Sequence, residues 1–260
     1  VGSYNCSDIV TITAVNESCY HFVNWSGDTG NISDVNSANT SIAMYGNYSI
    51  TANFAVYQYT LAYNASTGGS INGTTLQTVN CSANGSAVEA IPDTCYHFLN
   101  WSDGKTDNPR TDTNVTWNIN VSANFAVNTY DIDVIQAVNG VIVPGDVTVN
   151  CGGNQSFNIT ADDCYIIVSV IVDGTNYPVD PLAHANNGSV HFAGVDAAHN
   201  LSAVFAMDTY IINASTGANG TISPSGETAV NCSDNQSFTI TPAACHHIAD
   251  VLVDNISVGA

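Results

Sequence analysis

The chain has 260 residues, of which 22 are acidic and 2 are basic, so its formal net charge is −20. Only 9% of the residues are charged and 45% are hydrophobic, which means that the acidity comes from missing bases rather than from abundant carboxylates. The two basic residues, Lys105 and Arg110, cannot provide the surface that nucleic acids or anionic membranes require. No apolar run reaches the roughly 18 residues of a membrane-spanning helix. The composition therefore excludes nucleic-acid binding and membrane insertion.

The eight cysteines fall into four pairs whose members are 13 or 14 positions apart. An Asn precedes the first cysteine of every pair, and the second cysteine opens an apolar segment such as CYHFVNW or CYHFLNW. The pairs are Cys6 and Cys19, Cys81 and Cys95, Cys151 and Cys164, and Cys232 and Cys245. This recurrence predicts four tandem repeats, which we place at residues 1–56, 57–128, 129–208 and 209–260.

Each repeat has the period-two pattern of half-buried strands. In chain order, apolar and polar residues alternate over Ile119–Phe125, Tyr130–Val134 and Phe157–Ile159. Gly- and Asn-rich breaks such as Thr67–Gly69 and Asn219–Gly220 predict hairpin turns. No segment has a helical period, so we expect a mainly β fold in which small β-rich domains follow one another like beads on a string.

The repeat resembles a known family. The segments Tyr20–Trp25 and Tyr96–Trp101, with closing strands that end near Phe54, Phe125 and Phe205, are similar to the internalin-type B-repeat, also called the Listeria–Bacteroides repeat, in its divergent form. This resemblance implies a compact β-rich, β-grasp-like unit in a secreted surface protein of bacteria or archaea. It implies stalks, spacers or adhesive modules and no particular activity. The third and fourth repeats depart from the pattern because they lack the Trp and carry Val-Asp-Gly or Val-Asp-Asn.

The first and last repeats are incomplete. The first lacks the opening Tyr-x-Ile hairpin of the others, and the last stops before the closing Ala-x-Phe strand. The chain also begins at Val1 without Met, as a mature or excised product does. Such repeats expose unpaired strand edges. Either the chain is a fragment of a longer protein, or neighbouring copies supply the pairing and build a head-to-tail filament.

Asn-x-Ser/Thr sequons, the acceptors of N-glycans in secreted proteins, occur 22 times. Enrichment of Asn and Thr at β-turns and strand edges is the alternative explanation. Asn24 and Asn100 stand beside Trp and are set apart. We expect glycans at Asn5, Asn16, Asn31, Asn39, Asn47, Asn64, Asn72, Asn80, Asn84, Asn114, Asn120, Asn154, Asn158, Asn187, Asn200, Asn213, Asn219, Asn231, Asn235 and Asn255.

An even number of cysteines in a repeated frame of a secreted chain predicts disulfides. A spacing of 13 lacks the short C-x-x-C of zinc sites. The simplest connectivity closes each bridge within its own pair: Cys6–Cys19, Cys81–Cys95, Cys151–Cys164 and Cys232–Cys245. The alternative is a staggered ladder, Cys19–Cys81, Cys95–Cys151 and Cys164–Cys232. The ladder leaves Cys6 and Cys245 free to bridge neighbouring copies.

No residue pattern indicates a catalytic site. The sequence contains neither a Gly-x-Ser-x-Gly nucleophile elbow nor a phosphate-binding glycine loop. His21 and His97 are expected to be outward-facing strand residues. His246 and His247 follow Cys245, so a Cys-His-His metal site is the alternative there, whereas no ligand spacing relates His184, His191 and His199.

Asp103, Asp107 and Asp112 cluster around the two cations. We expect a polar, Pro-containing loop there, and a weak calcium site is the alternative. The aromatic residues Tyr20, Trp25, Tyr96 and Trp101 are expected to be core residues rather than a sugar-binding platform.

We therefore expect a non-enzymatic structural protein of the cell exterior that has no cofactor apart from covalent N-glycans. Its partner would be a further copy of itself, joined head to tail by strand pairing into a surface filament, sheath or surface layer. The alternative is a stalk region of a larger adhesin that binds carbohydrate or protein.

Overall fold

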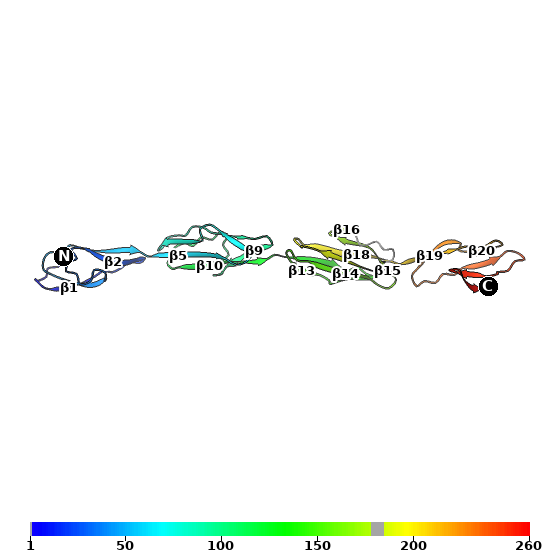
Figure 1. The fold of residues 1–260 in the computed structure, drawn as a ribbon, viewed down its shortest axis with the longest axis horizontal. Helices are drawn as coiled ribbons and strands as arrows, with labels where there is room; N and C mark the ends of the chain where they lie inside the picture. Colours follow the sequence, from blue (N-terminus) through cyan, green and yellow to red (C-terminus); the bar gives the residue numbers. More distant parts are fainter. Residues whose placement is uncertain (1, 178–184) are drawn as a thin grey trace. The chain divides into compact units, whose positions relative to one another are not determined.

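A computed structural model describes residues 2–177 and 185–260, and over these ranges the chain is built from β-strands and loops (Figure 1). No helix among these residues is long and apolar enough to cross a membrane. The prediction of a mainly β fold is confirmed. The strands group into two compact units, Val1–Asn128 and Thr129–Ala260.

In the first part of unit 1, two antiparallel strand pairs form separate small sheets. They are β1 (Ile9–Thr13) with β3 (Asn39–Ala43), and β2 (Tyr20–Gly27) with β4 (Ile50–Val56). Among residues 2–56, which the structure describes, only Trp25 and Ile42 are buried hydrophobic residues. The small core fits the absence of an opening hairpin, predicted from the sequence for this repeat.

The second part of unit 1 has a four-stranded sheet of order β7-β5-β10-β9. Its strands are β5 (Gln58–Ala65), β7 (Leu76–Asn80), β9 (Tyr96–Trp101) and β10 (Ile119–Val127), and a second pair joins β6 (Gly69–Asn72) to β8 (Glu89–Pro92). The opening strand β5 runs parallel to the closing strand β10, with Leu61 opposite Ile119. The core contains Leu61, Tyr63, Val88, Ala90, Trp101, Val115, Val121 and Ala123.

Unit 2 repeats this plan with more strands. A five-stranded sheet has the order β13 (Val147–Asn150), β11 (Thr129–Ile135), β18 (His199–Met207), β15 (Tyr165–Val172), β16 (Thr175–Tyr177). A three-stranded sheet has the order β12 (Gly140–Val143), β14 (Gln155–Ala161), β17 (Asn187–Phe192). The parallel pair β11–β18 places Ile132 opposite His199. In both parallel pairs the register begins two residues after the opening Tyr, Tyr59 or Tyr130.

The last part of unit 2 consists of three antiparallel strand pairs. They are β19 (Thr209–Ala214) with β21 (Gly226–Asn231), β20 (Gly220–Ser223) with β22 (Thr239–Pro242), and β23 (Val251–Val253) with β24 (Ile256–Gly259). Among the described residues, the opening strand β19 has no parallel closing strand, and the closing strand β4 has no parallel opening strand. The two terminal parts therefore lack complementary pieces of the same sheet.

A β-bulge recurs where each cysteine-led strand meets its closing strand. The register shifts past Val23 in the β2–β4 pair, past Leu99 in β9–β10 and past Val168 in β15–β18. The extra residue points outward in every case, with 44%, 53% and 55% of its surface exposed. Because a bulge reverses the alternation, Phe22 and Trp25 share a face although they are three positions apart, and their rings lie 5.6 Å apart.

Candidate functional site

Two disulfides connect consecutive repeats. Cys19 is bonded to Cys81 and Cys164 to Cys232, and the Cα atoms are 5.4 Å apart in both bridges, within the usual range. The prediction that each bridge closes within its own pair is wrong for these four cysteines. The staggered alternative is the one observed.

The direction of the strands explains why pairing within a repeat fails. In the sheet β7-β5-β10-β9, the outer strands β7 and β9 both run opposite to the parallel central strands. Cys81 follows the end of β7 and Cys95 precedes the start of β9, so the two cysteines lie at opposite ends of the sheet. Cys19 precedes β2, which pairs with β4, and β4 leads directly into β5. Cys19 and Cys81 therefore meet where β4 passes into β5.

The remaining cysteines divide into two groups. Cys95 and Cys151 are also disulfide-bonded. Cys6 and Cys245 are exposed free thiols, contrary to the expectation of a bridge for each of them within this chain. All eight cysteines thus have a defined state, six bonded and two free.

One linker residue separates each closing strand from the next opening strand, and it holds the neighbouring cysteines by its backbone. Tyr57 donates its N–H to the carbonyl of Cys19 at 2.9 Å and accepts from the N–H of Cys81 at 2.8 Å. Asp208 makes the same two bonds with Cys164 and Cys232, at 2.8 and 2.9 Å. We call this arrangement of linker and disulfide the joint.

The second cysteine of the first three cysteine pairs has a left-handed backbone, which is uncommon for a residue with a side chain. The φ angles of Cys19, Cys95 and Cys164 are 70°, 69° and 65°. The free thiol Cys245 has nearly the same φ, 63°. Its backbone is therefore already in the conformation of the bonded cysteines.

The two repeat-position histidines lie at the joints. The ring of His21 packs against that of Tyr57, with centroids 4.8 Å apart, and His97 Nδ1 is 2.8 Å from Asn128 Oδ1. His97 is exposed, as predicted. The outward prediction is wrong for His21, which is half-buried and whose Nδ1 is buried without a hydrogen-bond partner, because Tyr57 covers it. Sequence reasoning missed the linker residues, although each directly follows a closing strand.

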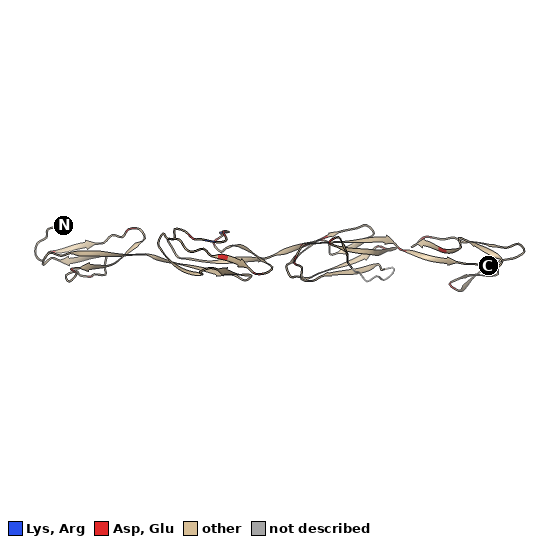
Figure 2. Cartoon of the chain, turned by 90° about the horizontal axis from the view of Figure 1, so that it is seen from above, with Lys and Arg blue, Asp and Glu red and all other residues tan. Residues whose placement is uncertain are grey.

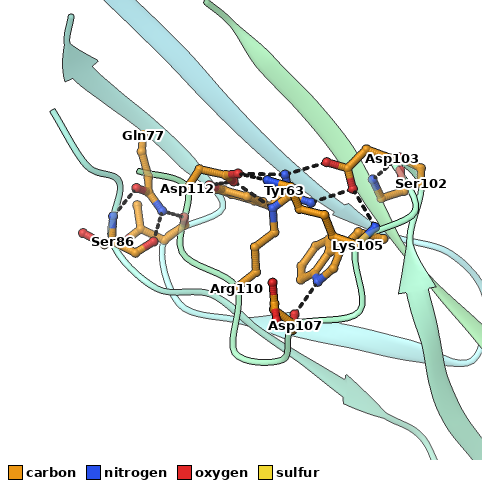
Figure 3. Close-up of polar contacts among 12 residues, drawn as sticks. Tyr63, Gln77, Ser86, Ser102, Asp103, Lys105, Asp107, Arg110 and Asp112 are labelled. Carbon is orange, nitrogen blue, oxygen red and sulfur yellow. Dashed lines mark hydrogen bonds and ion pairs between the residues drawn. The ribbon is translucent and has the colours of Figure 1, made fainter. Parts of the chain in front are cut away.

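The second repeat contains a buried ionic cluster that includes both cations of the chain (Figure 3). The guanidinium of Arg110, 2% exposed, forms two-pronged contacts with two carboxylates. It donates to Asp112 at 2.7 and 2.9 Å and to Asp103 at 2.8 Å twice. Lys105 Nζ lies 3.0 Å from Asp112, whose side chain is 2% exposed. The guanidinium carbon lies 5.3 Å from the ring centroid of Trp101, a cation–π distance.

Neutral groups complete the cluster. The hydroxyl of Tyr63, from β5, donates to Asp112 Oδ2 at 2.8 Å. The indole N–H of Trp101 donates to the carbonyl of Asp107 at 2.9 Å. Arg110 and Val88 exchange backbone hydrogen bonds of 2.8 and 2.9 Å. The cluster thereby fastens the long loop between β9 and β10 onto the core.

The contacts set the protonation states. Burial alone would raise the pKa of Asp112, but hydrogen bonds from Arg110, Lys105 and Tyr63 outweigh it and lower the pKa to about 2. The Arg110 hydrogen bonds also lower the pKa of Asp103. Burial and the bond to Asp112 raise the pKa of Tyr63. Asp112 and Tyr63 are thus held as carboxylate and phenol, a static arrangement rather than an acid–base pair near neutral pH.

The cluster leaves little for a metal ion. The oxygens of Asp103 and Asp112 are occupied by Arg110 and Lys105. Asp107 contributes its backbone carbonyl to Trp101. In the described part of the chain, no three Asp, Glu, His or Cys side chains gather as a metal site. The segment between β9 and β10 is a polar, Pro-containing loop, as expected.

The other histidines make separate contacts. His191 Nδ1 lies 2.8 Å from Ser156 Oγ, and His199 Nδ1 lies 2.7 Å from Asp173 Oδ2. The hydrogen bond from His199 lowers the pKa of Asp173. His246 Nδ1 contacts the carbonyl of Ala244 at 3.0 Å, and the triad of Cys245, His246 and His247 is not assembled as a metal site. His184 lies outside the described residues.

The expected core aromatics differ between repeats. Trp25 and Trp101 are 8% and 0% exposed, as predicted. Tyr96 is half-buried, whereas its counterpart Tyr20 is 45% exposed and is not a core residue. The difference follows from the first repeat, in which no opening hairpin covers this side chain.

The sequon asparagines sort by exposure. All twenty of those expected to carry glycans are exposed. Asn24 and Asn100, the two set apart, are only half-exposed, and their side-chain oxygens accept hydrogen bonds of 2.8 Å from Asn53 and Asn124. Charged residues make up 9% of the chain and colour only a small part of the ribbon (Figure 2).

Comparison with known proteins gives one match. Residues 1–58 and 59–129 each match the model of the divergent InlB B-repeat domain. The match covers 129 of the 260 residues, and over these residues the chain is similar to the divergent InlB B-repeat family. Searches of curated proteins and of solved structures found no match. In the two B-repeats, the Cys19–Cys81 bridge links one repeat to the next.

Proposed function

We propose that the protein is a non-enzymatic structural component of the cell exterior that polymerises head to tail into a filament, sheath or surface layer. The observation that supports this most is that the Cys19–Cys81 and Cys164–Cys232 bridges join consecutive repeats rather than stapling single ones. A bridge at a joint couples one repeat to the next. Coupling of this kind is what a load-bearing series of domains needs.

An extracellular location agrees with the disulfides, which persist in oxidising compartments and are rare in the cytosol. It also agrees with the match of residues 1–129 to the divergent InlB B-repeat domain, because the resemblance to this family implies a secreted surface protein. The third and fourth repeats share the cysteine frame and the opening-strand pattern, and we assign them the same role.

N-glycosylation is supported by the twenty exposed sequon asparagines. A neutral glycan coat would keep a chain with 45% hydrophobic and 9% charged residues in solution. The same coat would cover exposed apolar side chains such as Trp117 and Leu76, each 67% exposed.

The register of the two bridges gives a rule for the others. In each bridge, the second cysteine of one repeat joins the first cysteine of the next. The rule pairs Cys95 with Cys151, both of which are disulfide-bonded. The three bridges would form the ladder and leave Cys6 and Cys245 available at its two ends.

Polymerisation is supported by the free edges of β4 and β19. Elsewhere the equivalent edges pair in parallel, as β5–β10 and β11–β18. Unpaired edges of this kind favour strand addition. Contacts between different surfaces of identical copies build open polymers when the rotation from copy to copy does not close into a ring.

The test uses material purified from its natural source. Intact mass is measured before and after enzymatic deglycosylation and before and after reduction, and the native material is examined by negative-stain electron microscopy. We expect a large mass loss on deglycosylation, protected cysteines before reduction, and regular fibres or sheets. Unglycosylated monomers with reduced thiols would contradict the proposal, and monomers that bind carbohydrates would favour the adhesin.

A further inference from the structure

The first repeat has a shallow pocket of about 300 Å³ lined by Val15, Glu17, Tyr20 and Phe54. It is largely apolar, and its walls are exposed: Val15 is 79%, Tyr20 45% and Phe54 39% exposed. These four residues have counterparts in the second repeat. Ile91, Asp93 and Tyr96 have the same offsets from Cys95 as Val15, Glu17 and Tyr20 have from Cys19, and Phe125 has the place of Phe54 in the closing strand.

In the second repeat the counterparts hold the turn of the opening hairpin. A Cβ atom on Gly68 would overlap the ring of Tyr96, and one on Gly69 would overlap the ring of Phe125 and lie 2.6 Å from the carbonyl of Ile91. The N–H of Asp93 donates to the carbonyl of Gly68 at 2.9 Å. All four counterparts therefore touch one turn, which the first repeat lacks.

The third repeat holds its turn in the same way. Asn139 has a left-handed φ of 70°, as Gly68 has one of 99°. The N–H of Asp162 donates to the carbonyl of Asn139 at 3.0 Å, and a Cβ atom on Gly140 would overlap the ring of Phe205. The pocket thus has a defined type of occupant, a left-handed residue followed by a glycine. We call it the turn seat.

The fourth repeat has such a turn, but within the described residues it has no closing-strand phenylalanine to pack against it, as Phe125 and Phe205 do in the second and third repeats. Asn219 has a φ of 68°, and Gly220 meets only backbone atoms of Thr241 and Pro242 within 4 Å. Its strand β19 is also exposed. Ile212, the counterpart of the fully buried Leu61 and Ile132, is 40% exposed. The other two turns of this kind already contact a phenylalanine of their own repeat.

We infer that the Asn219–Gly220 turn of one copy docks into the turn seat of a second copy, with β19 adding in parallel to the partner's β4. This inference rests on the polymerisation in the proposed function and names its interface. The resulting sheet has the order β21-β19-β4-β2, which matches β7-β5-β10-β9. The shared register of the two parallel pairs places Ala214 opposite Ile50 of the partner subunit.

Docking is an exchange of partners, as in domain swapping. At present the carbonyl of Asn219 accepts from the N–H of Ala243 at 2.8 Å, and β20 pairs with β22 over four residues. In the second copy, Glu17 has the position of Ala243, and residues 13–16, which begin at the last residue of β1, have the positions of β22. Among the described residues, the N–H of Glu17 has no acceptor and β1 pairs only with β3. The docked hairpin gains contact with Tyr20 and Phe54.

The docked turn leaves no room for a glycan on Asn219. A bare side chain fits, because Asn139 occupies the same position in the third repeat. The inference therefore departs from the expectation of a glycan at Asn219: unlike the other nineteen sites, this sequon must be unoccupied in assembled material, which glycopeptide mapping measures. A glycan at Asn219 in every assembled copy would overturn it.

The main experiment uses the full unglycosylated chain with Cys6→Ser and Cys245→Ser, so that no bridge between free thiols contributes. We expect association that grows with concentration in sedimentation velocity. Gly220→Ala should weaken it about tenfold or more, because the added methyl overlaps the partner's Phe54. In the free chain that methyl lies 3.3 Å from the Thr241 carbonyl. Gly217→Ala, which meets nothing within 4 Å, is the matched control.

A crosslink tests the register directly. One batch of this background carries Ile50→Cys and the other Ala214→Cys, and they are mixed with oxidised glutathione, which accepts the two electrons and leaves as two thiols. We expect a dimer in which the cysteine at position 50 of one variant is bonded to the cysteine at position 214 of the other. Asn213→Cys, one register position away, should give much less of this dimer. Association that survives Gly220→Ala or crosslinks without preference overturns the inference and leaves polymerisation intact. A monomer at all concentrations overturns both.

Discussion

Asp112 is the residue on which the ionic cluster of the second repeat depends. Arg110, Lys105 and Tyr63 all donate to its carboxylate, and its side chain is 2% exposed. A buried ion pair that loses one partner leaves the other charge without compensation. Most of the stabilisation from this loop should therefore disappear with one carboxylate.

Replacing that carboxylate by an amide tests this dependence. Asp112→Asn should destabilise the second repeat by about 3–5 kcal/mol, because the buried guanidinium of Arg110 keeps only Asp103 as an anionic partner. Denaturant unfolding followed by Trp fluorescence measures the change. Asp107→Asn is the control, since the Asp107 side chain is exposed and only its backbone carbonyl binds Trp101. Equal stability of the two variants would contradict the argument.

The same residue predicts an acid-dependent loss of stability. The pKa of Asp112 is about 2 in the folded chain and ordinarily 3.8. A lowered folded pKa stabilises the fold above the unfolded pKa, and this contribution is lost as the pH falls from about 5 towards 2. The difference in the free energy of unfolding between the parent and Asp112→Asn should therefore shrink by on the order of 2 kcal/mol over this pH range. A difference that is independent of pH in this window would contradict it.

At the scale of single elements, the turn of the opening hairpin depends on the absence of a side chain. Gly69→Ala should destabilise the second repeat by about 1–3 kcal/mol, since the methyl overlaps Phe125 and the Ile91 carbonyl. Gly145→Ala, with nothing within 4 Å, is the matched control. Thermal unfolding measures both. If Phe125→Ala does not reduce the effect of Gly69→Ala, another contact is responsible.

Period-two alternation predicted the β class and the inward faces of several strands. Phe157 and Ile159 are fully buried and Asn158 is exposed, as the pattern indicates. Alternation alone could not place the aromatic strand that follows the second cysteine. The bulge at Val23 shifts the register there, and a bulge arises from pairing with a distant strand rather than from local sequence.

The site was predictable in its residue types and not in its pairing. Cysteine count and frame predicted disulfides, but connectivity depends on which strands run parallel. The parallel β5–β10 pair sends the two cysteines of one repeat to opposite ends of the sheet. Likewise, the clustering of charges around Arg110 was visible in the sequence. The role of Tyr63 was not, because it comes from a strand 49 residues away from Asp112.

At the scale of the whole molecule, the two basic residues allow a direct test of the ladder. Trypsin can cut only after Lys105 and Arg110, both of which lie between Cys95 and Cys151. After alkylation of the free thiols and digestion in denaturant without reductant, we expect the two large fragments to stay together, because a Cys95–Cys151 bridge spans the cuts.

Electrophoresis with and without reductant shows whether the two fragments remain joined. Addition of reductant should separate the fragments, and a sample reduced before digestion is the control. Fragments that separate without reductant would show that Cys95 and Cys151 are each bonded within their own side of the cut. The outcome bears on connectivity alone and leaves the exposure of the sequons untouched.

The joints also determine how far the chain can lengthen when its ends are pulled. The Cys19–Cys81 and Cys164–Cys232 bridges close loops with sequence separations of 62 and 68 residues. With Cys95–Cys151 closed as well, fewer than a third of the 260 residues remain outside a loop. Fully stretched, that part adds only about 3.3–3.6 Å per residue. In an optical-trap recording, oxidised protein should reach less than half the contour length of reduced protein.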